Sequence, residues 1–432
     1  MKRSVFVLAV LTVLLAGCSN GKAPSTDATE SKTATDQSAA HRQTASVEQN
    51  LAKQLLNAQP GDVITIPAGH YHFKRGLALH TNGVTIRGAG MHKTVLSFKG
   101  MVSGPQGLLV NGSNFTIEDL SIVDTMGDAL KIKQGDNIVI RRVLVSWTRG
   151  PSSKNGAYGL YPIRTKNLLI EDCVAKNASD SGIYVGQSKN AIVRNNTVSG
   201  NVAGIEIENT TNADVYGNTA TGNAGGILVF NMPNLAMDGH TTRVFKNHVY
   251  KNNHANFGAK GTPVASVPAG SGIVVNSYDR VEIFDNTIAD NKTANVIVSG
   301  YFSTNYYNKP GVNPDYNPYP KGIYIHDNHY EGGGTAPGLP AFLKIKNAMF
   351  GKDGHFPNVI WDGFFDPDNV GKNGLPPPAD RICVPNPDVD VLNLDGPNKY
   401  QHPRVDSKRF RCTLKPLPAV KLTFDKAAGT HA

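Results

Sequence analysis

The chain has 432 residues, 40% of them hydrophobic, and a formal net charge of +9 from 43 Lys and Arg against 34 Asp and Glu. Residues 399–432 carry a net +6 of this charge, and Lys2 and Arg3 add +2. Because only +1 remains for everything between, the composition excludes a broadly basic body, and we expect no nucleic-acid partner.

The N-terminus indicates export. Lys2 and Arg3 precede an apolar run, residues 5–15, which is too short to span a bilayer and has the flanks of a signal peptide. The run continues into Leu15-Ala-Gly-Cys18. This segment resembles the lipobox of bacterial lipoproteins, in which the cysteine is lipidated and becomes the mature N-terminus.

The residues after the lipobox predict the location of the protein. Ser19 stands where lipoproteins of the inner membrane usually carry Asp, so we expect an outer-membrane lipoprotein, anchored through lipidated Cys18 and facing the periplasm. An unlipidated periplasmic protein is the alternative. Residues 1–17 are then a lipoprotein signal peptide. Residues 18–44, with almost no large apolar side chains, form a flexible tether.

An amphipathic segment follows the tether. Val47, Leu51 and Leu55 recur at helical spacing, and a Pro-Gly-Asp turn follows at residues 60–62. We therefore predict a short helix that closes the open end of a solenoid.

A repeat of 22 residues dominates the middle of the chain. Its clearest copies are Ser181-Gly-Ile-Tyr-Val185, Ala203-Gly-Ile-Glu-Ile207 and Gly225-Gly-Ile-Leu-Val229. Short β-branched strands at a fixed period in this range indicate stacked coils that share one core. The predicted fold is all-β, a right-handed parallel β-helix built as a single-stranded solenoid over residues 45–331.

Each coil also has one slot that is asparagine in most copies. The slot residues are Leu120, Val143, Cys173, Asn196, Asn218, Asn247, Asn286 and Asn328. Stacked Asn side chains can pass hydrogen bonds from coil to coil, which favours a structural ladder over a row of ligand-binding groups. Cys173 is expected to be a buried small side chain in the same slot.

Outward-facing residues of successive coils form columns, because alternate residues of a strand point the same way. The predicted catalytic residues in and beside these columns are Lys131, Tyr161, Arg164, Asp180, Tyr184, Glu206 and Glu208. Carboxylates on neighbouring coils can divide acid and base roles in glycoside hydrolysis, whereas Lys, Arg or Tyr beside them suits a lyase or C5-epimerase. Asp180, Glu206 and Glu208 can instead hold a calcium ion through oxygen ligands. A solvated charged face without function is the alternative.

Insertions break the repeat at residues 147–157, 232–242, 253–270 and 300–320, and should flank one face of the solenoid. The last is rich in tyrosine, whose rings can stack on sugars or pin the loop to the solenoid, and both interpretations remain open. The predicted substrate-binding residues are Lys133, Gln187, Phe230, Tyr306, Tyr307, Tyr316 and Tyr319.

Residues 332–432 are rich in Pro and Gly and are predicted to form an irregular extension with a basic tail. Cys383 and Cys412 lie there in an exported protein, so we predict a disulfide bond between them. His70 and His72 alternate onto one face of an early coil, which is conceivable for a metal site but not diagnostic of one.

Four segments carry a family resemblance: Asn155-Gly-Ala-Tyr-Gly-Leu-Tyr-Pro162, Asp180-Ser-Gly-Ile-Tyr-Val-Gly-Gln-Ser188, Gly204-Ile-Glu-Ile-Glu-Asn209 and Gly225-Gly-Ile-Leu-Val-Phe230. Through them residues 45–331 resemble exported bacterial parallel β-helix repeat proteins. The resemblance implies a right-handed β-helix, export and a second exported protein as partner, but no established activity. The chain is more distantly similar to pectate lyases, polygalacturonases and alginate epimerases. None of their catalytic motifs can be placed on it, and the Asp-Pro-His-Asp motif of alginate epimerases is absent.

Two functions remain open at this stage. One is a polysaccharide lyase, glycoside hydrolase or epimerase that acts on an envelope polysaccharide in a groove over the Gly-Ile-x-Val strands. The other is a non-catalytic envelope protein that uses the same groove to bind a glycan or a protein partner.

Overall fold

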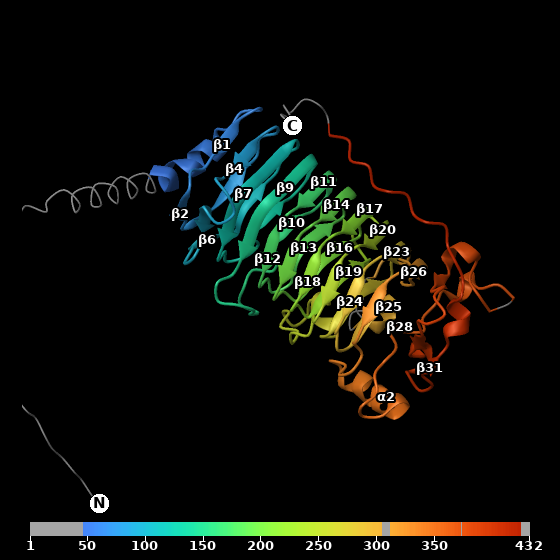
Figure 1. Ribbon diagram of the computed structural model, residues 1–432. Helices are drawn as coiled ribbons and strands as arrows, with labels where there is room; N and C mark the ends of the chain where they lie inside the picture. Colours follow the sequence, from blue (N-terminus) through green and yellow to red (C-terminus); the bar gives the residue numbers. More distant parts are fainter. Residues whose placement is uncertain (1–45, 305–311, 373, 425–432) are drawn as a thin grey trace, which may run out of the picture. The chain divides into compact units, whose positions relative to one another are not determined.

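The computed structural model describes residues 46–304, 312–372 and 374–424. These residues belong to one compact unit, which extends from Thr44 to Ala432 and winds as a parallel β-helix (Figure 1). The predicted all-β, right-handed parallel β-helix is confirmed. No helix in the described ranges is long and apolar enough to cross a membrane.

Three faces of strands run along the solenoid, here called faces A, B and C. Face A consists of β1 (Val63–Thr65), β4 (Thr85–Arg87), β7 (Phe115–Val123), β9 (Gly135–Ser146), β11 (Thr165–Glu171), β14 (Lys189–Arg194), β17 (Thr211–Tyr216), β20 (His240–Phe245), β23 (Asp279–Phe284), β26 (Lys321–His326) and β29 (Ile382–Cys383). Face B consists of β2 (Gly69–His72), β5 (Thr94–Ser97), the second halves of β7 and β9, β12 (Val174–Lys176), β15 (Thr197–Ser199), β18 (Thr219–Thr221), β21 (His248–Tyr250), β24 (Thr287–Ala289) and β27 (His329–Glu331).

Face C is a separate sheet, whereas β7 and β9 join faces A and B into one sheet by pairing in both. Face C consists of β3 (Arg75–Leu79), β6 (Ser103–Val110), β8 (Leu130–Ile132), β10 (Leu160–Pro162), β13 (Ser181–Gly186), β16 (Ala203–Glu208), β19 (Gly225–Phe230), β22 (Ser271–Asn276), β25 (Ala294–Ser299), β28 (Val359–Trp361), β30 (Val391–Asn393) and the antiparallel edge strand β31 (Arg404–Val405).

The strand register follows the sequence repeat. Ile205 of β16 pairs with Ile183 of β13 and with Ile227 of β19, and all three are fully buried. The repeat needs glycine because a Cβ on Gly204 would lie 2.5 Å from the carbonyl oxygen of Gly226 in the next coil. The inward side chains of all three faces meet in one continuous apolar core.

The predicted asparagine ladder is present, and a second ladder lies beside it. In the first, the Asn196 side chain donates to Asn218 Oδ1 at 2.9 Å, and the Asn218 side chain donates to Asn247 Oδ1 at 2.9 Å. The second ladder, which the sequence analysis did not identify, consists of Asn201, Asn223, Asn252 and Asn291. Cys173 is buried and its backbone amide joins the first ladder at Asn196, as expected of its slot.

The N-terminal helix, described over residues 46–56, buries Leu51 and Leu55 against the first coils. At the other end, the extension predicted as irregular from residue 332 continues the solenoid. β28 pairs in parallel with β25, β30 with β28, and β29 with β26. Apolar segments such as 359–361 can extend the core although no 22-residue period marks them.

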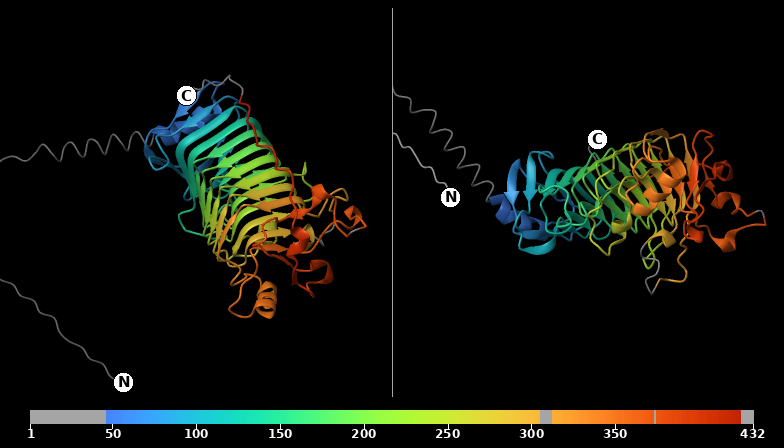
Figure 2. Two further views of the ribbon diagram at one scale, coloured as in Figure 1. Left: turned by 45° about the vertical axis from the view of Figure 1, so that its right-hand side comes forward. Right: turned by 90° about the horizontal axis from the view of Figure 1, so that it is seen from below.

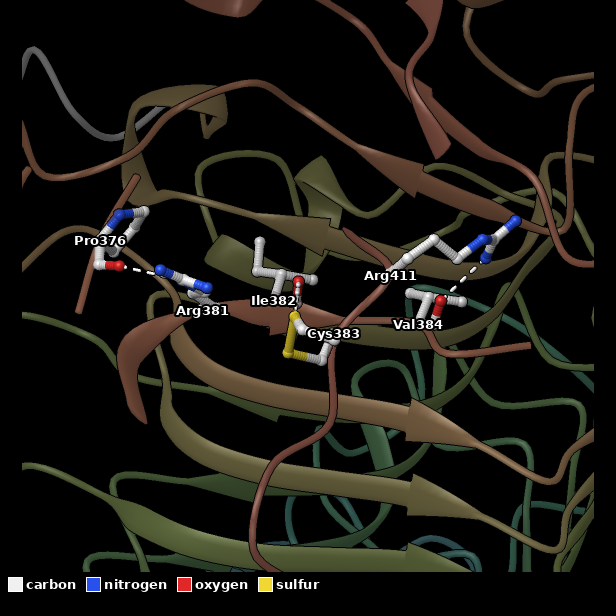
Figure 3. The surroundings of a disulfide bond; sticks show 7 residues. Pro376, Arg381, Ile382, Cys383, Val384 and Arg411 are labelled. Atoms are coloured by element: carbon white, nitrogen blue, oxygen red, sulfur yellow. Dashed lines mark hydrogen bonds between the residues drawn. A yellow bond between two sulfur atoms is a disulfide. The ribbon is translucent and has the colours of Figure 1, made fainter. Parts of the chain in front are cut away.

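The rest of the extension contains one α-helix and several 3₁₀ turns in its described residues. These are α2 (Pro340–Phe350), η3 (Pro367–Asn369), η4 (Pro378–Asp380), η5 (Gly396–Asn398) and η6 (Ser407–Phe410), while η1 (Pro263–Ser266) and η2 (Tyr301–Ser303) lie in the insertions. Cys383 and Cys412 form a disulfide bond, next to which Arg411 donates to the Val384 carbonyl (Figure 3). Residues 413–424 run back along the outside of the solenoid (Figure 2).

Candidate functional site

A cluster of acidic and tyrosine side chains lies on the outer side of face C, where β8, β10, β13 and β16 stack. We call it the acid–tyrosine cluster. Its members are Asp128, Lys131, Tyr158, Tyr161, Asp180, Ser181, Tyr184, Glu206 and Glu208. The register brings them together, because Lys131 pairs with Tyr161 and Tyr184 pairs with Glu206.

Three carboxyl groups form the centre of the cluster. The Ser181 hydroxyl lies within hydrogen-bonding distance of Asp180, at 3.0 Å, and of Glu206. One hydroxyl carries only one proton, so Ser181 donates to one of the two carboxyl groups at a time, and the Tyr158 hydroxyl is a further hydrogen-bond partner of Asp180. Tyr184 donates to Oε1 of the third carboxyl group, Glu208, at 2.5 Å.

Burial shifts the protonation of all three groups in one direction. Burial, aided by the Glu208 charge, raises the pKa of Asp180 to about 7. Burial also raises the pKa of Glu206, with further contributions from Asp180 and Glu208, and it raises the pKa of Glu208. Because no Lys or Arg pairs with these carboxyl groups among the described residues, the cluster holds protons near neutral pH that ordinary surface carboxylates have lost.

Tyrosines connect this centre to the surface. The Tyr158, Tyr161 and Tyr184 rings pack together with centroid separations between 4.3 and 4.9 Å. Tyr184 is buried, whereas Tyr158 and Tyr161 are half-buried, and burial raises the pKa of Tyr161 to about 12. Lys131 lies 4.3 Å from the Tyr161 ring centroid and 3.6 Å from Asp128. The one described cation of the cluster is thus paired with Asp128 rather than with the three central carboxyl groups.

Other residues predicted for the site lie outside this cluster. Lys133 and Arg164 are exposed where their strands end. Gln187 is buried, and its side-chain oxygen accepts a hydrogen bond from Ala236 in the 232–242 insertion. Phe230 is buried in an apolar cluster farther along face C.

The tyrosine-rich insertion is described only in part. Tyr316 is buried and donates to the Asn231 carbonyl at 2.6 Å, so this ring pins the loop to the solenoid. Tyr319 packs against Phe302, with ring centroids 5.1 Å apart. Tyr306 and Tyr307 lie outside the described residues, as does Cys18.

Tyr158 and Ser181 were missed as site residues by the sequence analysis. Tyr158 is three residues from Tyr161, but it lies before β10 begins, so the alternating pattern of the strand does not include it. Ser181 lies just before the repeated glycine, where the next two coils have Ala203 and Gly225. Ser271 also occupies this position in β22, so the residue type alone did not mark Ser181 as a site residue. For metal binding, no group of three or more His, Cys, Asp or Glu side chains among the described residues is arranged to hold an ion.

The chain was compared with known proteins. The model of the family described as periplasmic copper-binding protein (NosD) matches residues 80–333. Solved structures that it resembles include the mannuronan C-5 epimerase AlgE4 A-module from Azotobacter vinelandii, with 18% identity over 74% of this chain and 76% of that chain and a TM-score of 0.45. Another is endopolygalacturonase I from Stereum purpureum, with 13% identity over 65% of this chain and 95% of that chain and a TM-score of 0.42. No sequence match was found among curated proteins.

Proposed function

The chain belongs to the family described as periplasmic copper-binding protein (NosD), and we propose that it is an envelope protein whose acid–tyrosine cluster binds a polysaccharide and exchanges protons with it. The anchor at Cys18 and the outer-membrane location remain part of this proposal. Proton exchange of this kind would be used by a lyase, a glycoside hydrolase or an epimerase.

One observation carries the proposal: three buried carboxyl groups, whose pKa values burial raises, lie together without a Lys or Arg ion-pair partner among the described residues. An arrangement of this kind destabilises the fold relative to an apolar one, and perturbed acids of this kind concentrate at functional sites. The pKa of Asp180, raised to about 7, suits a group that both gives and takes protons near neutral pH. Tyr158 and Tyr161 are half-buried beside the acids, and their rings can pack against a sugar.

The shape of the fold favours a polymer over a small molecule. Parallel coils repeat about every 4.8 Å, so face C presents a long row of side chains at a constant spacing. Lys131 and the exposed Lys133 lie along the same face and would favour a polymer that carries carboxylates. Calcium at Asp180, Glu206 and Glu208 would require these carboxyl groups to lose the protons that burial favours, so we place proton transfer ahead of calcium binding there.

The test uses a panel of neutral and uronic-acid polysaccharides, with and without calcium. New reducing ends, unsaturated products and exchange of solvent protons are followed in parallel. The proposal would be supported by turnover that is lost in Glu206→Gln and kept in the control variant Asp136→Asn, which changes an exposed carboxylate. Retention on a glycan column without turnover would assign the protein to the non-catalytic alternative, and no interaction with any uronic-acid polymer would overturn the proposal.

Copper is a second candidate, suggested by the family's description and, independently, by one pair of side chains that precedes the matched residues 80–333. Copper prefers imidazole, thiolate and thioether ligands. In the described residues Cys173 is in the core and Cys383 and Cys412 are joined to each other, so the thiols are not available. His70 Nδ1 and His72 Nε2, both exposed, lie 3.2 Å apart. Metal–nitrogen bonds of about 2 Å place adjacent ligand nitrogens about 2.9 Å apart, so this pair fits two ligand positions of copper(II).

The pair supports a two-nitrogen site and no larger one, because no third His, Cys, Asp or Glu completes it among the described residues. Titration with copper(II), followed by electron paramagnetic resonance, should show nitrogen coupling that His70→Ala removes. His92→Ala, at another exposed histidine, is the matched control. Coupling that persists in His70→Ala would exclude this pair as the copper site.

A further inference from the structure

A cavity lies near the C-terminal end of face C, next to the acid–tyrosine cluster, since Phe230 at its edge pairs with Glu208. It encloses about 900 Å³ between β19, β22 and β25 on one side and α2 on the other. This volume is within the range of about 300–1,000 Å³ that is usual for ligand pockets. It is not used by the proposed polysaccharide site.

The floor of the cavity is apolar because the outward column of face C changes character along the solenoid. The column is Tyr184 and Glu206 in the earlier coils, and it continues as Leu228, Val274 and Ile297. Outward apolar side chains need a cover, and η1, α2 and the segment around Leu394 supply one. The cover is incomplete, since the space over Val274 and Ile297 remains open.

The roof is helix α2, whose residues Phe342, Ile345 and Met349 line the cavity and are only partly buried. The helix is held in place at its C-terminal end, where the ammonium group of Lys346 is buried and donates to the carbonyl oxygens of Gly351 and Lys352. These roof side chains pack against the apolar cluster of the floor, but the space that remains between the two layers can hold an apolar molecule.

Two polar side chains of the walls, Asn276 and Asp362, are already hydrogen-bonded within the protein. The Asn276 side chain donates to Ser299 Oγ at 2.9 Å and to the Gly300 carbonyl at 3.0 Å. Asp362 accepts from the Gly300 amide at 2.7 Å and from the Ser303 hydroxyl at 2.6 Å. A sugar would leave most of its hydroxyl groups without partners here, which costs about 1–3 kcal/mol for each group.

Two lysines lie at the rim of this otherwise apolar space. Lys344 of α2 and Lys399, just after η5, both line the cavity, and both are exposed. Neither forms an ion pair with a carboxylate of the described chain. An apolar interior with positive charge at its mouth is complementary to an amphiphile that carries a negative head group.

We propose that this cavity binds a single long acyl chain, with the anionic head group of the ligand at Lys344 and Lys399. The shared chemistry is that of a free fatty acid or a lysophospholipid. The proposal is independent of the polysaccharide site, because no member of the acid–tyrosine cluster lines the cavity.

The test uses protein that begins at residue 44, since residues 44–432 form one compact unit with its own core. Palmitate and palmitoyl-lysophosphatidylglycerol are titrated by displacement of a fluorescent fatty acid, and native mass spectrometry counts the bound chains. We expect one chain per protein. Tighter binding of palmitate identifies a free acid as the ligand, whereas binding of the lysolipid that is at least as tight identifies a phospholipid.

Ile297→Trp fills the floor and should weaken binding at least about tenfold, since it excludes methylene groups that contribute about 0.8 kcal/mol each. If Ile297→Trp lowers the Tm, Met349→Trp fills the cavity from the roof and provides the second cavity-filling variant. Replacing Lys344 and Lys399 together by Ala should weaken palmitate roughly three- to tenfold in low salt, whereas Lys93 and Lys166, exposed lysines elsewhere, should not matter. The proposal would be overturned if palmitate binding were not saturable, or if both Trp variants bound palmitate with the affinity of the native protein.

Discussion

The backbone amide of Val420 donates a hydrogen bond of 3.1 Å to Oδ2 of Asp214, across 206 residues of sequence. Asp214 is buried in β17, where it also accepts from the Arg243 guanidinium group at 2.8 Å. The extended chain after Cys412 therefore completes the hydrogen bonding of a carboxylate in the middle of face A.

The same tail contacts face A at a regular spacing. The contacting residues are Leu417, Val420 and Thr423, three residues apart, and their partners are Glu282, Asp214 and Asn167. Each partner lies two coils from the next, because Glu282 and Asp214 both pair with Arg243 of the coil between them. Three residues of extended chain span about 9–10 Å, which matches two coils of about 4.8 Å each. The tail thus fits the rise of the solenoid and clamps its coils.

Truncation of the tail should destabilise the solenoid. A chain that ends at Cys412 loses two hydrogen bonds to buried carboxylates, each of which contributes about 1.5–3 kcal/mol, and leaves Asp214 and Glu282 short of donors. We expect a fall of about 3–6 kcal/mol in the free energy of unfolding, measured by urea denaturation. A chain that ends at Phe424 retains all three contacts and is the control. Equal stability of the two truncated chains would contradict the clamp.

The asparagine ladders predict a graded loss of stability. Asn218 is fully buried, accepts from the Asn196 backbone amide and side chain, and donates to Val193 and Asn247. Asn218→Ala leaves several buried polar groups without partners, so we expect a loss of at least about 3 kcal/mol, visible as a lower Tm in calorimetry.

Asn328, at the end of the same ladder and only half-buried, is the matched control. Asn328→Ala should lower the Tm less, because water can reach the groups that it leaves behind. Equal losses at the two positions would mean that the ladder contributes no more in its centre than at its end.

Much of the fold could be predicted because the repeat places each residue type by its physical need. Ile205 must face the core and Gly204 must allow the next coil to approach, so both recur every 22 residues. The coils added by β28, β29 and β30 could not be predicted, since insertions separate them from the repeat and each offers only two or three residues of pattern.

The candidate site was predictable only where it follows the period of a strand. Glu206 and Tyr184 lie in one outward column, and the register brings them together as expected. Whether a charged column is solvated or buried depends on the loops that cover it, and these have no period. The sequence therefore did not indicate that Glu206 is 4% exposed, or that Tyr158 and Ser181 join the cluster.

The disulfide bond should stabilise the C-terminal coils. Cys383 is in β29, which extends face A, and the bond closes a loop of 29 residues. Closing a loop of this length lowers the entropy of the unfolded chain. In the chain-entropy treatment this raises the free energy of unfolding by about 3.6 kcal/mol at room temperature, and measured effects are typically 2–4 kcal/mol. Dithiothreitol should therefore lower the Tm of the native protein. Dithiothreitol should not change the Tm of a variant in which Cys383 and Cys412 are both Ala. An unchanged Tm of the native protein in dithiothreitol would contradict the prediction.

Asp180 should make the folded protein less stable as the pH rises. Its pKa is raised to about 7 by burial, whereas an unfolded Asp has a value of about 3.9. Between these values the folded chain binds more protons than the unfolded chain, so the free energy of unfolding falls as the pH rises through this interval. Asp180→Asn removes the titrating group and keeps the shape, and it should flatten that fall.

From pH 5 to pH 8 the native protein should lose at least about 1.4 kcal/mol more than Asp180→Asn, the equivalent of one pKa unit, in urea denaturation. Asp136→Asn, at an exposed carboxylate, should follow the native profile. Parallel profiles for the native protein and Asp180→Asn would mean that this carboxyl group is already ionised at pH 5. Asp180 would then have no proton to exchange at neutral pH, and its part in the proposed proton exchange would fail.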